Sequence, residues 1–363
     1  MSALAVSGGL LLVLTVLWDA FETIILSRRV SRRMRLARLF YVLTWTPWKV
    51  LVGRFRDKNR RENYLGFYGP LSILLLLVLW AAALIVGFAL LHWGLGSRMR
   101  VPEGLSGFAA DLYLSGTNFF TLGLGDVTPE TNLARALTVV EAGTGFGFLA
   151  LVIGYLPVLY QAFSRREAHV SLLDARAGSP PTAAELLRRN CQAHDQGALE
   201  QLLHDWERSA AELLESHVSF PVVAFFRSQH DNQSWVAALT TVLDSCSLVI
   251  AGTKDAPLRA ARLTFAMARH ALVDMCAVFL LRVRPLAGDR LPPDEMTRLR
   301  QSLALAGVPL PEGESVERKL AELRGMYEPY ANTLAAFLLM PLPAWVPPVR
   351  VRDNWQTTGL IRE

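Results

Sequence analysis

The chain has 363 residues, of which 52% are hydrophobic and only 19% charged, with a mean hydropathy of +0.28. A soluble domain carries about 25% charged residues, so this composition excludes an ordinary soluble globule. Up to Phe163 the chain holds 15 Lys and Arg against 9 Asp and Glu, whereas the remainder is nearly neutral. Because the excess positive charge lies beside long apolar segments, it indicates membrane loops and not a nucleic-acid-binding surface.

The cysteine content and the amino-terminal sequence further restrict the class of protein. The three cysteines, Cys191, Cys246 and Cys276, are widely spaced and odd in number, which excludes a disulfide framework. The first residues lack the basic segment and small-residue cleavage site of a signal peptide. We therefore expect an integral membrane protein whose C-terminal half is soluble.

Apolar segments predict three membrane-spanning helices, near residues 3–27, 70–93 and 132–163. Each is long enough to cross the ~30 Å hydrocarbon core of a bilayer. Asp19 and Glu22 lie one turn apart on the first helix. They are expected to pair with the arginines that follow or with the next helix.

The segment Leu36–Phe55 allows two interpretations, because it is apolar on average but contains two basic residues and Pro47. Basic clusters flank it at residues 28–35 and 54–61. A spanning helix would place one cluster outside, against the positive-inside tendency, whereas an amphipathic helix on the cytoplasmic surface satisfies both. The surface interpretation is preferred; it places the N-terminus outside and the chain after Ser164 in the cytoplasm.

Between the second and third spans lies Trp93–Thr131, which is neither spanning nor strongly polar. Within it, Ser106–Phe120 predicts a short helix and Thr121–Pro129 a loop. Both ends of the stretch meet the same membrane face, so a helix that enters here must turn back. Such a re-entrant backbone is tolerated only where it is buried in protein or lines a water-filled path.

The loop reads Thr121-Leu-Gly-Leu-Gly-Asp126. It resembles the Thr-Val-Gly-Tyr-Gly-Asp filter of tetrameric potassium channels, and it has the right position between two spans. Backbone carbonyls replace the hydration shell of a cation without a fixed charge that would trap it. Successive carbonyls point the same way only if right-handed and left-handed backbone conformations alternate. Glycine adopts the positive φ of the left-handed conformation at little cost, which explains Gly123 and Gly125.

The resemblance covers about residues 70–163 and implies an outer helix, a pore helix, a filter and an inner helix. It implies K+ sites at the carbonyls of Thr121, Leu122, Gly123 and Leu124 and the Thr121 hydroxyl, in a filter that runs to Gly125. One filter per chain implies a homotetramer.

Several positions depart from the family pattern. Leu124 replaces the usual aromatic residue, as in the second pore loops of two-pore-domain potassium channels, which leaves open whether potassium is strictly preferred over sodium. Thr117 stands where some members carry a glutamate. Asp126 then lacks its usual acidic partner, and we expect Tyr113 on the pore helix to donate a hydrogen bond to it instead.

The inner helix holds further candidate residues. Glu141 is a charged residue inside a predicted span, where a charge is energetically costly. Three roles are open for it: a brace behind the filter, a charge that lines the cavity, or a surface residue of a shorter span. Gly145 aligns with the family's hinge glycine, and either a hinge or close helix packing explains it. Gly154 and Pro157 lie where channels bend this helix near the intracellular gate.

The sequence predicts N-terminal helices at 1–69 and the pore module at 70–163. The C-terminal half is expected to contain a linker at 164–181, an all-helical cytoplasmic domain at 182–340 and a Pro/Trp-rich tail at 341–363. A capping-box spacing at Thr182-Ala-Ala-Glu185 starts the domain. Cys191, His194 and His204 lack a second ligand pair, so a metal site is not expected. Catalytic and nucleotide-binding glycine motifs are absent as well.

The predicted fold is therefore an all-α membrane protein, with a tetrameric potassium-channel pore module and an all-helical cytoplasmic domain. We expect passive potassium conduction across the cell membrane, with K+ as the permeant ion, no cofactor and no enzymatic activity. The bilayer, monovalent cations and three further copies are the expected partners, and no gating ligand is identified. The alternatives are a weakly selective monovalent cation channel and a membrane-tethered enzyme or scaffold with a vestigial pore.

Overall fold

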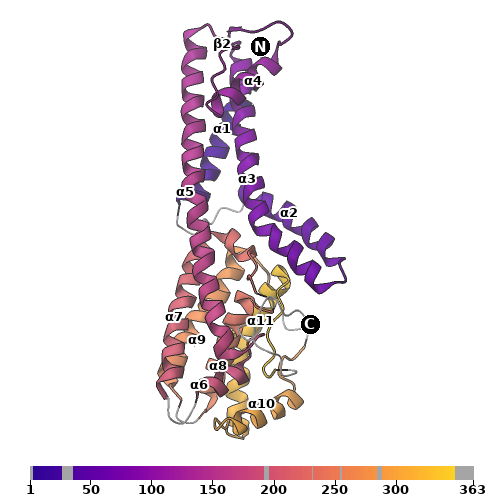
Figure 1. The fold of residues 1–363 in the computed structure, drawn as a ribbon, viewed down its shortest axis with the longest axis vertical. Helices are drawn as coiled ribbons and strands as arrows, with labels where there is room; N and C mark the ends of the chain where they lie inside the picture. Colours follow the sequence, from indigo (N-terminus) through magenta and orange to yellow (C-terminus); the bar gives the residue numbers. More distant parts are fainter. Residues whose placement is uncertain are drawn as a thin grey trace, which may run out of the picture. The chain divides into compact units, whose positions relative to one another are not determined.

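The computed structural model describes residues 3–26, 36–191, 196–230, 232–253, 256–283 and 288–347. The arginines at 28–35, His194 and the tail from residue 348 lie outside the described residues. The chain divides into two compact units, Met1–Tyr160 and Gln161–Glu363. Nearly all described elements are helices, which confirms the predicted all-α class (Figure 1).

The first unit contains the membrane helices. Its elements are α1 (Ala3–Ala20), the π-helical turn η1 (Phe21–Ile25), α2 (Leu36–Gly53), α3 (Lys58–Gly94), β1 (Met99–Arg100), α4 (Phe108–Phe119), β2 (Thr128–Pro129) and the start of α5 (Asn132–Ala177). Strands β1 and β2 pair antiparallel and join the two ends of the stretch between α3 and α5. Three segments are long and apolar enough to cross a membrane, namely Ala3–Ile25, Asn59–Gly94 and Asn132–Ala177, and α2 is not among them.

Helix α3 is longer than the predicted 70–93, because it begins at Lys58. The Asp57 side chain accepts a hydrogen bond from the Asn59 amide, which caps the helix. Leu65 and Tyr68 are buried in this early part of α3, which packs against α2. The boundary expected at residue 69 therefore falls inside a helix that is stabilised by its contact with α2.

Helices α1 and α3 pack closely and run antiparallel (Figure 1). A Cβ atom on Gly9 would lie 2.6 Å from the Gly87 carbonyl oxygen, and one on Gly94 would lie 2.8 Å from the Val6 amide nitrogen. Small residues at these positions let the two backbones approach, as is typical of helix packing in membranes. The antiparallel pairing places the start of α1 beside the end of α3.

The beginning of α2 is fixed by an acid on α1. Asp19 is buried, and its Oδ2 accepts hydrogen bonds from the Ala37 amide at 2.9 Å and the Trp80 indole at 3.1 Å. A carboxylate at a helix N-terminus satisfies a free amide and complements the helix dipole. Of the two expected partners for Asp19, the structure shows the next helix.

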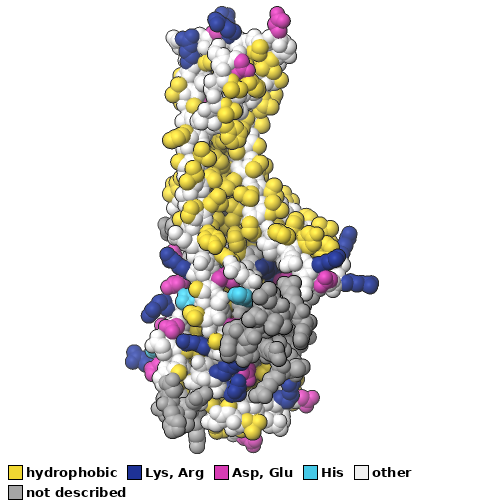
Figure 2. All heavy atoms as spheres, in the orientation of Figure 1, with side chains coloured by type: hydrophobic (Ala, Val, Ile, Leu, Met, Phe, Trp, Pro, Cys, Tyr) yellow, Lys and Arg dark blue, Asp and Glu magenta, His cyan; other side chains and the backbone are white. Residues whose placement is uncertain are grey.

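Apolar side chains gather over much of the first unit on the face that Figure 2 shows. Val78 on α3 is 64% exposed and Ile153 on α5 is 64% exposed, although both belong to spanning segments. Such a surface is unfavourable in water and suits the acyl chains of a bilayer.

The second unit is the helical domain predicted for the C-terminal half. It continues α5 and adds α6 (Ala183–Asn190), α7 (Gln196–Ser219), the 3-10 turn η2 (Pro221–Phe225), α8 (Trp235–Ala251), α9 (Leu258–Val278), α10 (Pro293–Leu305) and α11 (Glu314–Leu338). Helix α8 is buried along almost its whole length and packs against α9 and α11. The described elements of this unit between residues 182 and 340 are helical, as the predicted all-helical domain requires.

The predicted linker at 164–181 is wrong for most of its length, because α5 stays helical to Ala177. Val170, Leu173 and Ala177 are buried and lie at helical spacing, so their packing sustains the helix. The following α6 starts where the capping-box spacing predicts, since Thr182 Oγ1 accepts a hydrogen bond from the Glu185 amide at 3.3 Å.

The described part of the tail, residues 341–347, is not helical and packs onto the second unit. Trp345 is buried, and its carbonyl oxygen accepts a hydrogen bond from the Ala184 amide at 3.1 Å. Arg290 donates to the Pro343 carbonyl oxygen at 2.9 Å.

Candidate functional site

The candidate filter follows directly from the end of the short helix α4. The Thr121 amide donates to the Asn118 carbonyl at 2.9 Å, and the Leu122 amide donates to the Thr117 carbonyl at 2.8 Å. These bonds satisfy carbonyls at the helix end that would otherwise lack partners. The backbone therefore turns out of α4 within two residues, which places the loop at the helix C-terminus.

Left-handed backbone alternates along this loop. The φ angles are +57° at Thr121, +54° at Gly123 and +78° at Gly125, and the intervening Leu122 and Leu124 do not share this conformation. A β-branched residue in that region costs about 1–3 kcal/mol and persists only where its surroundings impose it. The alternation is the backbone geometry that a row of carbonyls facing one side requires.

In the single chain, the large apolar side chains of this loop are exposed. Phe120, Leu122 and Leu124 are each about 60% exposed, although Phe119, just before them, is buried. Three large apolar side chains on a short exposed loop are unfavourable in water. They indicate a loop that is completed by other molecules.

The expected hydrogen bond beside the filter is present: the Tyr113 hydroxyl donates to Asp126 Oδ2 at 2.8 Å. Asp126 Oδ1 also accepts from the Val127 amide at 3.1 Å. Thr117 is buried, and its hydroxyl donates to the Leu114 carbonyl at 2.9 Å, within α4 itself. The residue after the loop is thus held by the helix before it.

Glu141 on α5 is fully buried and contacts α4 and α3, and its neighbour on α3 is a histidine that sequence reasoning missed. His92 on α3 is also fully buried, and its Nε2 lies 3.6 Å from Glu141 Oε2. Asn118 on α4 donates to the same carboxylate oxygen at 3.4 Å. Of the three roles considered for Glu141, this position favours the brace behind the filter. The only sequence signal for His92 was a titratable residue in the last turn of an apolar helix.

Gly145 lies against the end of α4. A Cβ atom on Gly145 would approach the Phe119 Cα and carbonyl carbon to 2.8 Å, and the Phe119 carbonyl oxygen even more closely. Close packing therefore explains this glycine, while its hinge role stays a prediction. A Cβ on Gly154 meets nothing within 4 Å, and α5 continues through Pro157.

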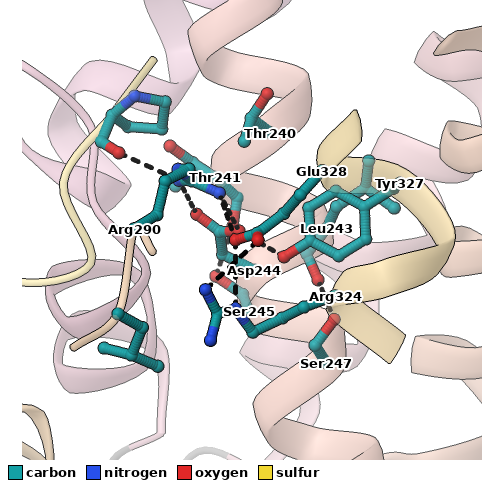
Figure 3. A network of polar contacts seen from close by, with 12 residues as sticks. Thr240, Thr241, Leu243, Asp244, Ser245, Ser247, Arg290, Arg324, Tyr327 and Glu328 are labelled. Carbon is teal, nitrogen blue, oxygen red and sulfur yellow. Dashed lines mark hydrogen bonds and ion pairs between the residues drawn. The ribbon is translucent and has the colours of Figure 1, made fainter. Parts of the chain in front are cut away.

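Buried polar groups of the second unit form a network around α8 (Figure 3). Arg290 donates to Asp244 Oδ1 at 3.1 Å and Oδ2 at 2.8 Å, and to Glu328 Oε1 at 2.9 Å. The Tyr327 hydroxyl donates to Asp244 Oδ1. These acidic groups raise the pKa of the Arg290 guanidinium despite the opposing effect of its burial. Apart from Arg290 Nε, which has no hydrogen-bond partner within the described residues, these groups are paired with one another, which indicates a structural role.

The described residues offer no metal site, since no group of three His, Cys, Asp or Glu side chains converges among them. Cys191, Cys246 and Cys276 are free thiols. Burial raises the pKa of Cys191 and of Cys276 to about 11, so neither is a reactive thiolate near neutral pH.

Comparison with known proteins supports the assignment of the pore segment. Residues 73–161 match the family model described as "Ion channel". A membrane protein of Bacillus subtilis (strain 168), described as uncharacterized and named YdjJ, is 24% identical over 202 residues, which cover 54% of this chain and 56% of that protein. No solved structure matches. The chain is thus a membrane protein, and its residues 73–161, which hold α4, the candidate filter loop and apolar helical segments on either side, are similar to an ion-channel domain.

Proposed function

We propose that the ion-channel domain conducts potassium passively through a filter made of Thr121, Leu122, Gly123, Leu124 and Gly125. The observation that carries the proposal is the alternating left-handed backbone at residues 121, 123 and 125, directly after α4. Dehydrated K+ would bind the carbonyl oxygens and the Thr121 hydroxyl, and repulsion between ions in adjacent sites would release them. The C-terminal dipole of α4 would favour a cation in the cavity below.

The filter requires a homotetramer. One chain supplies one row of carbonyls, whereas a dehydrated cation must be surrounded on all sides. The exposed Leu122 and Leu124 side chains and the exposed apolar face of α5, with Phe146 67% exposed, supply surfaces that neighbouring subunits and lipid would cover. We place the assembly in the cell membrane, with the N-terminus and the filter outside and the helical domain in the cytoplasm.

Potassium flux from liposomes that contain the purified full-length protein tests the filter. Gly123→Ala is expected to abolish flux, because alanine disfavours a φ of +54° even though no neighbouring atom obstructs its Cβ. Gly96→Ala is the matched control, since Gly96 has a φ of +62° and equally open surroundings. Unchanged flux in Gly123→Ala would show that this loop is not the filter. No flux in the wild type would favour a scaffold with a vestigial pore.

Selectivity depends on Leu124, the position at which the filter departs from the family pattern. We expect reversal potentials that favour potassium over sodium in the wild type and more strongly so in Leu124→Tyr. If the wild type does not discriminate and Leu124→Tyr does, the protein is a weakly selective monovalent cation channel.

We also propose that the helical domain gates the pore through α5, because this one helix contributes residues to both units. In the second unit, Arg166 on α5 is buried and donates to the Val223 and Phe226 carbonyls, both at 2.9 Å, and to Glu167 Oε1 at 3.0 Å. A movement of the η2 segment would therefore be transmitted to α5.

Single-channel recording of charge-removing variants tests this coupling. Arg166→Gln is expected to change the open probability and to leave the unitary conductance as it is. Arg165→Gln is the control, since Arg165 is the preceding residue and is exposed. Equal open probability in both variants and the wild type would show that Arg166 has no role in gating.

A further inference from the structure

A cavity of about 660 Å³ lies between α2 and α3, away from the filter. Its lining residues are Thr44, Thr46, Pro47, Trp48, Val50, Leu51, Arg54, Tyr68, Leu71, Ser72 and Leu75. The volume is within the range of about 300–1,000 Å³ that is typical of small-molecule sites. The cavity therefore has room for a ligand in addition to the side chains that form it.

Four of the polar residues in the lining, Thr44, Tyr68, Ser72 and Trp48, form hydrogen bonds to neighbouring protein groups. The Thr44 hydroxyl lies 2.9 Å from the Tyr68 hydroxyl, Ser72 Oγ donates to the Gly69 carbonyl at 2.8 Å, and the Trp48 indole donates to the Tyr64 carbonyl at 3.2 Å. Apart from Thr46 and Arg54, the surface that remains to face the cavity is aliphatic and aromatic. Such a surface offers little to water or to a polar ligand and suits a hydrocarbon chain.

The cavity lies where the charged part of α3 gives way to its spanning part. Leu71 and Leu75 belong to the uncharged stretch of α3, and they are 41% and 47% exposed. Leu51 on α2 is 55% exposed on the same cavity. The apolar lining is thus continuous with the surface that faces acyl chains, at the level where lipid headgroups begin.

Arg54 is the one charged residue among those that line the cavity. Its side chain is exposed, and no acidic group within the described ranges pairs with it. The nearby acids are engaged elsewhere, since Asp57 pairs with Arg60 at 3.6 Å and Glu62 with Arg61 at 4.0 Å. A free guanidinium beside an apolar cavity matches a phosphate joined to a hydrocarbon chain.

We propose that this cavity binds an anionic phospholipid, with one acyl chain between α2 and α3 and its phosphate on Arg54. The site is formed within one chain. Its occupant holds α2 against α3 at the membrane surface, because the chain fills the space that the helices leave open. Binding of this lipid does not depend on whether the pore conducts.

Quenching of Trp48 fluorescence by brominated acyl chains tests the site in the full-length protein. The protein is reconstituted in phosphatidylcholine that contains a small fraction of either dibrominated phosphatidylglycerol or dibrominated phosphatidylcholine. The contribution of Trp48 is the difference between the wild type and Trp48→Phe. Half-quenching is expected at an about fivefold lower mole fraction of the brominated phosphatidylglycerol, because one basic residue near the surface favours an anionic lipid by about 1 kcal/mol.

Variants that remove single charges distinguish a specific lipid site at Arg54 from general attraction of anionic lipid to the basic surface. Arg54→Gln should abolish the preference, and Arg54→Lys should retain most of it. Arg56→Gln is the matched control, because Arg56 is exposed and does not line the cavity. Equal quenching by both lipids in the wild type would mean ordinary surrounding lipid, and no quenching by either would mean a neighbouring subunit on the cavity. Either result would overturn the proposal, as would an equal loss in the Arg56→Gln variant or an unchanged preference in Arg54→Gln.

Discussion

Each unit of the protein buries a cluster of charged groups, and the two clusters differ in how completely they are satisfied. In the second unit both oxygens of Asp244 accept hydrogen bonds from Arg290, at 3.1 and 2.8 Å. In the first unit Glu141 Oε2 accepts one bond of 3.4 Å, and Glu141 Oε1 has no hydrogen-bond partner among the described residues. The Asp244 network is the more fully paired of the two, although Arg290 Nε lacks a partner within the described ranges. A more fully paired network fixes one structure, whereas a sparsely paired one beside the candidate filter leaves room for water or adjustment.

The surroundings of the two clusters explain this difference. The second unit buries its charges in a helical core that includes Trp235 and Trp345, so each unpaired charge there would be costly. Around Glu141 the packing depends on glycine instead, since Gly145 on the next turn lies against α4. Breaking the Asp244 cluster should therefore destabilise the fold, and altering the Glu141 cluster should act mainly on the pore.

The largest expected effect follows from removing Asp244, the central acid of the Arg290 network. Asp244→Ala should destabilise the second unit by about 3–5 kcal/mol, because Arg290 and Tyr327 lose a buried partner. Hydrogen–deuterium exchange of α8 and α11 peptides in the full-length protein should speed up more than a hundredfold. Glu295→Ala is the control: it breaks an ion pair with Arg298 whose side chains are 32% and 46% exposed, and should cost about 0–1 kcal/mol.

The next largest effect is expected at Gly145. Gly145→Ala inserts a methyl group against the Phe119 backbone, and overpacking of this kind costs about 1–3 kcal/mol. We expect fewer assembled tetramers on native gels and lower potassium flux. Gly143→Ala should change neither, because a Cβ on Gly143 meets nothing within 4 Å. Normal assembly together with altered open probability in Gly145→Ala would instead support the hinge role.

A pH effect is expected in the second unit at His217, which is buried against Trp235 with Nε2 3.4 Å from Arg166 Nη1. Burial, with the Arg166 charge in addition, holds the pKa of His217 well below its usual value. The unfolded chain therefore binds a proton that the folded chain does not. Stability should be fully present above the unfolded pKa of about 6.5 and fall by up to about 1.4 kcal/mol per pH unit below it.

Exchange of α7 peptides at pH 7.5 and 5.5, corrected for intrinsic rates, measures this effect. His217→Gln should remove the part of the pH dependence that the histidine contributes. His204→Gln should leave it in place, since His204 lies on the same helix with its side chain 47% exposed. Identical pH dependence in the wild type and in His217→Gln would exclude the assignment.

The smallest stability effect is expected from Glu141→Gln, which keeps an acceptor for Asn118 and removes the charge beside His92. We expect assembly to be retained with a stability change of about 1 kcal/mol or less. The readout is the rate at which potassium current declines during sustained opening, which should change if Glu141 braces the filter. A lower unitary conductance at an unchanged rate of decline would indicate a cavity-lining charge instead.

Some of this architecture was predictable because it depends on local sequence. Long apolar runs predicted the three spans, and the C-terminal half was predicted to be an all-helical domain. The left-handed backbone of the candidate filter loop was predictable at Gly123 and Gly125, because glycine is the residue type that adopts this conformation most easily. The hydrogen bond from Tyr113 to Asp126 was also predictable, since both residues lie near one loop.

Other features could not be read from the chain. The early start of α3 and the helical course of α5 to Ala177 depend on burial against partners far away in the sequence. His92 gave only an unspecific signal, because a single histidine at the end of an apolar helix has many explanations until Glu141 is found beside it.

The sequence by itself determined which segments avoid water and where the backbone takes a left-handed turn, because hydrophobicity and glycine content act residue by residue. Only the tertiary structure decided which buried charges meet, that Gly145 packs on the end of α4, and that α2 and α3 enclose a cavity beside Arg54. Those outcomes depend on distances between helices, and such distances arise from packing and not from the pattern of any single segment.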